Sequence, residues 1–230
     1  MPAALIRFLF NLCRSLMPLG IAAVVFACAT ALAMEFDTVR VQKVAHERYG
    51  SRGAKTVSGW MAMMSQYRSK PESQMLSVVN EFWNSNVRGS EDAVIWKQAD
   101  YWATPLETLG KQAGDCEDFV IGKYFSLVHM GVPADKLRFI YVRARVGGMG
   151  STQSIAHMVL GYYSSPTAEP LVLDSLTSSI APASQRRDLT PVFSFNAQGI
   201  YVAGAAPAPV DRISRWRTLL VRMQEQGFRP

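Results

Sequence analysis

The feature that most constrains the fold is residues 114–131, which open with acids and then become apolar on nearly every side. The stretch begins with the letters GDCED and continues with FVIGKYFSLVHM before a glycine ends it. Asp115 is a good N-cap, and a helix that is apolar nearly all round must be buried. The sequence therefore predicts a central, buried helix whose first turn carries Cys116.

The chain before this helix is predicted to be helical. Within residues 55–84, apolar side chains recur at spacings of three and four, and the pattern breaks at Lys70-Pro71. Such spacing indicates two amphipathic helices joined at the proline. Residues 84–104 have mixed polarity and are expected to form an ordered connection.

The chain after the central helix is predicted to form strands. The candidates are rich in β-branched and aromatic residues and are separated by glycine and proline. They are residues 137–145, 154–163 and 171–174, with shorter ones at 191–195 and 200–202. A last amphipathic helix is expected around residues 213–223. Helices first and strands later favour an α+β fold, in which a helical N-terminal lobe and the central helix pack on an antiparallel sheet.

The N-terminus has the pattern of an export signal. Residues 15–34 carry no charged side chain, follow Arg7 and Arg14, and run into a small-x-small site ending at Ala33. We expect cleavage after Ala33, so that residues 1–33 are a signal peptide and residues 34–230 form a single periplasmic domain. An uncleaved inner-membrane anchor is the alternative, because about 20 apolar residues suffice to span a bilayer.

Charge and cysteine content narrow the functional classes. Removing residues 1–33 leaves 22 basic and 18 acidic side chains, a net charge of +4. No block of five like charges occurs, which argues against nucleic acid as a partner. The exported part keeps one cysteine, Cys116, which has no partner for an internal disulfide. That thiol is either an inert buried residue or a nucleophile.

Three residues together favour the nucleophile. Backbone N–H groups at a helix start stabilise a thiolate, and acyl transfer also needs a base and an acceptor that orients the base. His157 and Asp174 supply these types on two separate predicted strands. Taken singly, His157 would be interpreted as a core histidine and Asp174 as a turn residue. In combination with Cys116 they predict a catalytic triad, in an order that resembles papain-like and transglutaminase-like enzymes.

The acids around the cysteine suggest a metal ion. Uncompensated carboxylates of Asp115, Glu117 and Asp118 would raise the thiol pKa and suppress the thiolate. Calcium binds carboxylate oxygens in flexible geometry and would remove this conflict. The alternative is that the acids merely cap the helix. A zinc site is disfavoured, since no paired cysteine or histidine spacing accompanies the triad.

Six motifs in order carry a family resemblance, which runs from about residue 101 to residue 202. They are the letter groups DYWATP from Asp100, GDCED from Gly114, KYF from Lys123, AHMVL from Ala156, PLVLD from Pro170 and PVFSFN from Pro191. Together they resemble the LapG-type bacterial transglutaminase-like cysteine proteases.

The resemblance implies a papain-like, transglutaminase-like fold with Cys116 as nucleophile, His157 as base and Asp174 as orienting acid. It further implies calcium held by the acids around the cysteine. The implied substrate is a large RTX-type surface adhesin, cut at a dialanine site near its N-terminus to promote biofilm dispersal. The implied regulator is an inner-membrane receptor for cyclic di-GMP. An amide transferase with the same triad, or a non-catalytic peptide-binding module, are the alternatives.

Two further expectations concern single elements. An oxyanion needs a donor besides the Cys116 backbone N–H, and Trp102 or Gln112, upstream of the nucleophile, are candidates. The basic C-terminal helix around Trp216 either packs on the core with a solvated arginine face or docks on the receptor or on anionic lipid.

Overall fold

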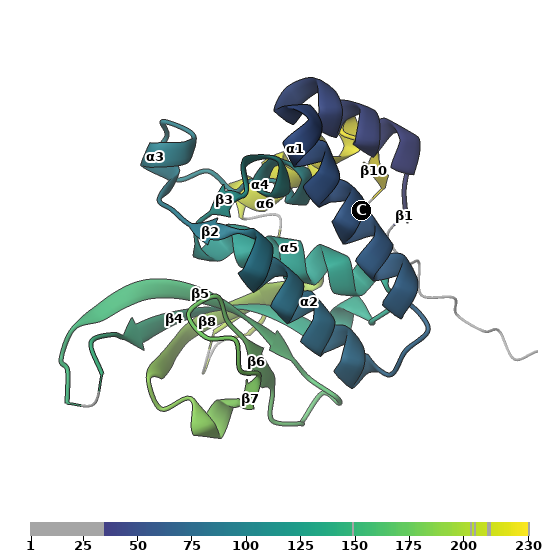
Figure 1. Ribbon diagram of the computed structural model, residues 1–230. Helices are drawn as coiled ribbons and strands as arrows, with labels where there is room; N and C mark the ends of the chain where they lie inside the picture. Colours follow the sequence, from purple (N-terminus) through teal and green to yellow (C-terminus); the bar gives the residue numbers. More distant parts are fainter. Residues whose placement is uncertain (1–34, 149, 203, 205, 211–212, 230) are drawn as a thin grey trace, which may run out of the picture. The chain divides into compact units, whose positions relative to one another are not determined.

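Helices and an antiparallel sheet form two layers in the computed structural model, which describes residues 35–229 except 149, 203, 205 and 211–212 (Figure 1). The α-helices are α1 Thr38–Tyr67, α2 Glu72–Asn86, α3 Asp92–Ile95, α4 Pro105–Lys111, α5 Cys116–His129 and α6 Ser214–Glu225. The main sheet has the order β7-β6-β5-β4-β8-β9. Helices first and sheet later confirm the predicted α+β class.

The main strands follow the predicted ranges closely. They are β4 Leu137–Arg145, β5 Ser154–Tyr162, β6 Leu171–Leu173, β7 Ala181–Pro182, β8 Leu189–Asn196 and β9 Gly199–Tyr201. β4 pairs with β5 along its whole length, with Val142 opposite His157. β5 pairs with β6 from Leu160 opposite Leu173, so the residue after β6, Asp174, is brought towards His157.

The helical layer begins earlier than the sequence pattern indicates. The break between α1 and α2 falls at Pro71 as expected, but α1 extends back to Thr38, where the Asp37 side chain caps it by accepting from the Arg40 backbone N–H. The first half of α1 buries few apolar side chains, among them Val41 and Ala45. The apolar periodicity of this part of the sequence is therefore weak. Gly50, with φ at 65°, interrupts the helix in a conformation that a glycine adopts without strain.

The segment before α5 contains more structure than a connection. The strands β2 Arg88–Gly89 and β3 Ala113–Gly114 pair in parallel, with α3 and α4 between them in sequence. A capping box between Thr104 and Glu107 starts α4 at Pro105, a proline position that suits the first helical turn. The β2–β3 pair is what brings the start of α3 next to the start of α5.

α5 is buried between the other helices and the sheet, as predicted. Its residues from Asp118 to Leu127 are all buried. The Trp60 and Trp83 indole N–H groups, from α1 and α2, both donate to the Ser126 hydroxyl at 2.7 and 3.0 Å. Gly122 lets α2 approach closely, because a Cβ atom there would lie 2.3 Å from the Trp83 ring.

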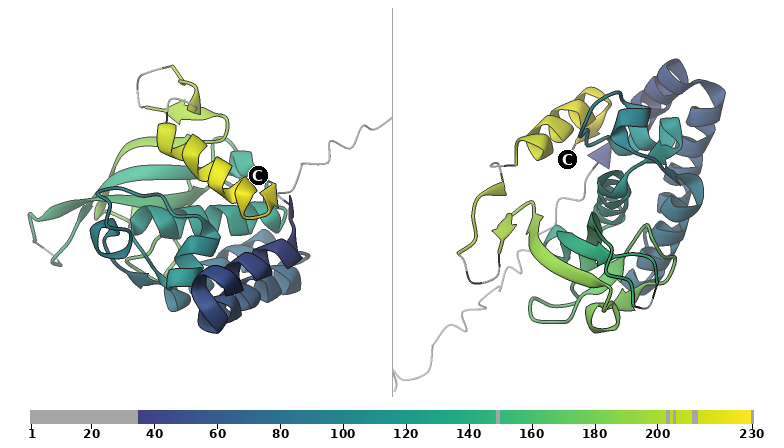
Figure 2. Two further views of the ribbon diagram at one scale, coloured as in Figure 1. Left: turned by 90° about the horizontal axis from the view of Figure 1, so that it is seen from above. Right: turned by 90° about the vertical axis from the view of Figure 1, so that its left-hand side faces the viewer.

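The C-terminal segment packs against the core and the N-terminal helix (Figure 2). Trp216 of α6 is 5% exposed and stacks on Phe125 with ring centroids 5.7 Å apart, which agrees with the packing interpretation of this helix. Beyond it, β10 Phe228–Arg229 pairs with β1 Glu35–Phe36. None of the helices within the described residues is both long and apolar enough to cross a bilayer. The predicted signal peptide, residues 1–33, lies outside those residues, and the division of the chain at Ala33 stays a prediction.

Candidate active site

Cys116 is the first residue of α5 and lies in a cleft of about 580 Å³. One wall of the cleft contains Asp115 and Glu117 at the start of α5, and another contains Ile155, Ala156 and His157 of β5. The structure thus brings the predicted nucleophile and the predicted base into one cavity, although 41 positions separate them in the sequence.

His157 and Asp174 form a tight buried pair. The His157 Nε2 and Asp174 Oδ1 atoms lie 2.6 Å apart, and the two side chains are 3% and 0% exposed. This contact leaves Nδ1 as the ring nitrogen available to the thiol. The next residue, Met158, directs its backbone N–H to the Cys116 sulfur, which lowers the pKa of the thiol. Cys116 and His157 line the same cleft, and the sulfur lies close to the main chain of β5.

Arg186, which no sequence pattern indicated as a site residue, completes the surroundings of Asp174. Its guanidinium donates to Asp174 Oδ2 at 2.6 Å and also binds Asp188, while the Leu176 backbone N–H donates to Asp174 Oδ1 at 3.0 Å. Burial alone would raise the pKa of Asp174, but the hydrogen bonds from His157, Leu176 and Arg186 hold it well below its usual range. Asp174 is therefore a carboxylate that can orient an imidazole.

Polar side chains of the helical layer also bind the main chain at Asp174. The Asp174 carbonyl accepts from Lys123 Nζ and from Asn84 Nδ2, both at 2.9 Å, and Lys123 also donates to Asn80 Oδ1 at 2.8 Å. Lys123 is fully buried on α5, and burial lowers its pKa to about 7. The nucleophile helix and the acid of the candidate triad are thus joined through one buried amine.

The thiol form of Cys116 is favoured over the thiolate in this arrangement. It donates to Glu117 Oε2 at 2.7 Å. Burial raises the pKa of the thiol far above its ordinary value, and the charges of Glu117 and Asp115 raise it further. The acids beside the nucleophile thus oppose formation of the thiolate, as their positions in the sequence predict.

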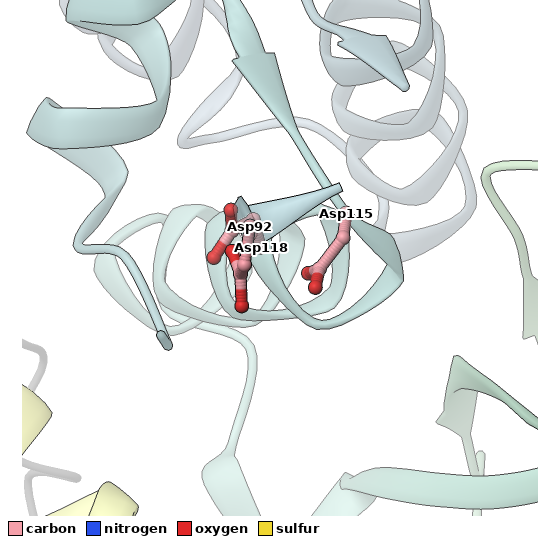
Figure 3. A group of neighbouring side chains, drawn as sticks. All are labelled: Asp92, Asp115 and Asp118. Atoms are coloured by element: carbon pink, nitrogen blue, oxygen red, sulfur yellow. The ribbon is translucent and has the colours of Figure 1, made fainter. Parts of the chain in front are cut away.

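Three carboxylates gather at the start of α5: Asp92, Asp115 and Asp118 (Figure 3). One ligand atom from each lies within 4.8 Å of the others. Burial raises the pKa of Asp115 to about 9, with Asp118 and Glu117 adding to the shift, and the pKa values of Asp118 and Asp92 are raised as well. Asp92 was not predicted; it begins α3, which the β2–β3 pair holds beside α5.

This acidic group fits a calcium ion by its donor chemistry. One oxygen on each of the three side chains is buried without a hydrogen-bond partner among the described residues. Buried carboxylates in such mutual repulsion are stable as anions only if a cation accompanies them, and calcium prefers oxygen ligands. Glu117, whose carboxylate faces the Cys116 thiol, is outside this set of three, and its role as a ligand stays a prediction.

Neither predicted oxyanion donor lines the cleft. The Trp102 ring is 4% exposed and stacks on Phe195, and the Gln112 amide donates to Thr56 Oγ1 at 2.6 Å. The Trp102 ring is thus packed in the core, and the Gln112 amide is bonded to α1. The Cys116 backbone N–H at the helix start is the donor that remains from the sequence analysis.

A cysteine at a helix start, with a histidine on a strand paired to an aspartate that follows the neighbouring strand, is typical of cysteine enzymes of the transglutaminase-like class. Residues 38–187 match the bacterial transglutaminase-like cysteine proteinases. The chain is also similar to solved structures of Legionella pneumophila LapG, whereas no curated protein sequence matches it significantly. The chain belongs to the bacterial transglutaminase-like cysteine proteinase family.

The similarity to LapG extends over most of both chains. EGTA-treated LapG is 38% identical with a TM-score of 0.71, and the match covers 80% of this chain and 96% of LapG. Calcium-bound LapG is 39% identical with a TM-score of 0.69, covering 80% and 98%. The fold and the cysteine proteinase class are thus shared with LapG.

Proposed function

We propose that the protein is a calcium-dependent cysteine endopeptidase that uses Cys116, His157 and Asp174. The observation that carries the proposal is the buried His157–Asp174 pair, 2.6 Å between Nε2 and Oδ1, in the same cleft as Cys116. An oriented imidazole beside a thiol at a helix start is the arrangement that acyl transfer requires.

The reaction proceeds through a thioester. The imidazole of His157 takes the thiol proton, and the Cys116 sulfur attacks the peptide carbonyl carbon. The C–N bond breaks as the imidazolium protonates the leaving amine. Water, deprotonated by the same imidazole, then attacks the thioester and releases the carboxylic acid and the thiol. Asp174 keeps the ring in the orientation that both halves need, and Arg186 keeps Asp174 ionised.

Asp92, Asp115 and Asp118 would hold the calcium ion. The ion would neutralise the carboxylates at the start of α5 and lower the pKa of the Cys116 thiol. Without calcium the protein would be inactive, since burial and the charges of Glu117 and Asp115 raise the pKa of the Cys116 thiol.

The substrate we propose is the N-terminal region of a large RTX-type surface adhesin, cut at a dialanine site after export of the protease to the periplasm. Support comes from the sequence resemblance and from the apolar stretch before Ala33. Cleavage would release the adhesin and promote biofilm dispersal, and an inner-membrane cyclic di-GMP receptor would restrain the protease by sequestering it.

Purified protein incubated with adhesin N-terminal fragments, with and without chelator, tests the proposal. We expect cleavage only with calcium, and a loss of at least about 10⁴-fold for Cys116→Ala. Mass spectrometry separates the alternatives: hydrolysis adds water to the products, whereas amide transfer joins an added amine. Binding without either product would identify a peptide-binding module, and more than about a tenth of wild-type activity in Cys116→Ala would reject the nucleophile.

A deletion strain tests the cellular part. Loss of the protease should leave adhesin on the cell surface and increase attachment, and rescue should require Cys116. Unchanged adhesin retention would reject the substrate while leaving the chemistry intact.

A further inference from the structure

β5 has one edge that is only partly paired. The strand has nine residues, and β4 pairs with all of them. On its other edge, the three-residue strand β6 pairs only with Leu160, Gly161 and Tyr162. Within the described part of the chain, no strand pairs with residues 154–159 on this second edge.

The register identifies the groups that face the unpaired edge. In an antiparallel strand, the N–H and C=O of one residue point to one edge and those of the next residue to the other. The Gln153 carbonyl accepts from the Val146 N–H on the β4 side. Ser154 and Ala156 have the opposite parity to Gln153, so their N–H and C=O groups point to the unpaired edge.

This edge borders the catalytic cleft and is open to solvent. Ser154, Ile155 and Ala156 are exposed, and Ile155 and Ala156 line the cleft that contains Cys116. Two apolar side chains stand beside it, Ile155 at 43% and Leu176 at 55% exposed. Residues 154–158 extend over about 14 Å, which is room for about four residues of an added strand.

We propose that the substrate's main chain binds as an added β-strand on this edge, hydrogen-bonded to the N–H and C=O groups of Ser154 and Ala156. The inference rests on the proposed proteolytic function and names the form of substrate that it acts on: a locally extended, unpaired segment of chain. A strand on this edge enters the cleft that contains Cys116, because Ile155 and Ala156 line that cleft. Main-chain pairing of this kind gives affinity without demanding particular side chains.

The first test removes one edge donor. Ser154→Pro deletes an N–H that points away from β4, so the β4–β5 ladder keeps its hydrogen bonds. Ser154→Ala, which keeps the N–H, sets the reference rate. We expect kcat/KM for the cleaved adhesin fragment to be at least about tenfold lower for S154P than for S154A. The rate of Cys116 alkylation by iodoacetamide, which needs no strand pairing, should be equal in the two variants.

The second test leaves the protein unchanged and covers the case in which S154P does not fold. Each amide of the shortest peptide that the wild-type protein cleaves is N-methylated in turn. Edge pairing predicts losses of about tenfold or more at every second position and small losses between them. Losses without this alternation, or equal rates for folded S154P and S154A, would overturn strand docking while proteolysis stands. If the wild-type protein with calcium cleaves no fragment, the proposed function itself fails and the docking inference fails with it.

Discussion

The pKa of Lys123 measures how strongly the interior of this fold disfavours a buried charge. Its amine is fully buried and bonds two oxygens, those of Asn80 and the Asp174 main chain. Burial lowers its pKa from 10.5 to about 7, against a smaller opposing effect of the Asp174 charge. The perturbation is Lys123→Met, which keeps the length of the side chain and removes the titrating group.

The sign of the pH effect follows from proton binding. Between about pH 7 and 10.5 the unfolded chain keeps the Lys123 proton and the folded chain has lost it, so the wild-type free energy of unfolding rises with pH over this range. The two pKa values give a rise of about 2 kcal/mol between pH 7 and pH 9 from this residue. Below about pH 6 the contribution is constant, because the amine is then charged in both states. Lys123→Met should lack the rise.

Urea unfolding followed by tryptophan fluorescence at pH 7, 8 and 9 measures the effect. Saturating calcium keeps the acidic group at α5 in one state, and all other groups cancel in the difference between wild type and variant. The wild-type free energy minus that of Lys123→Met should rise by about 2 kcal/mol from pH 7 to pH 9. A difference that is flat with pH would refute the reasoning, because Lys123 would then have an ordinary pKa in the folded protein.

Three further predictions concern the metal group, the triad and the core. Asp92→Asn should weaken calcium binding at least about tenfold in calorimetric titration and raise the melting temperature of the calcium-free protein; unchanged affinity would exclude Asp92 as a ligand. Arg186→Gln should lower the free energy of unfolding by about 3 kcal/mol and reduce kcat, whereas Arg187→Gln, at an exposed neighbour, should change neither. Gly122→Ala should lower the free energy of unfolding, measured in urea, by about 1–3 kcal/mol, because the added methyl group overpacks the α2–α5 contact. Gly59→Ala, where the nearest atom lies 4.0 Å from the added Cβ, should be neutral or stabilising. Equal effects of the two substitutions would contradict the close approach of α2 to α5.

The parts of the fold that the sequence predicted are those with a strong local signal. β4 matches its predicted range, because an unbroken run of aromatic and β-branched residues, Phe139 to Val142, forms its centre. The first half of α1 and the whole of α4 were missed. The former presents few apolar side chains to the core, and the latter owes its start to a capping box at Thr104 that no apolar period accompanies.

The residues of the candidate site likewise fall into those that the sequence could predict and those that it could not. Cys116, His157 and Asp174 could be chosen from residue type and order, because acyl transfer requires those three kinds of group. Asp92 and Arg186 could not be chosen, since each acts through a distant pairing. The β2–β3 pair carries Asp92 to α5, and the turn after β7 carries Arg186 to Asp174. The sequence around Asp92 and around Arg186 contains no pattern that indicates these contacts.

The pairing of β1 with β10 has a consequence for the order of folding. The backbone N–H of Asp37 donates to the Gly227 carbonyl at 2.8 Å, and the Arg40 guanidinium donates to the Glu225 carbonyl at 2.6 Å. The first turn of α1 is thus tied to a segment 185 positions further along the chain. Contacts of such sequence separation close a long loop and form slowly, so this end of the helical layer is completed late in folding, after the local contacts of α5 and of the β4–β5 pair.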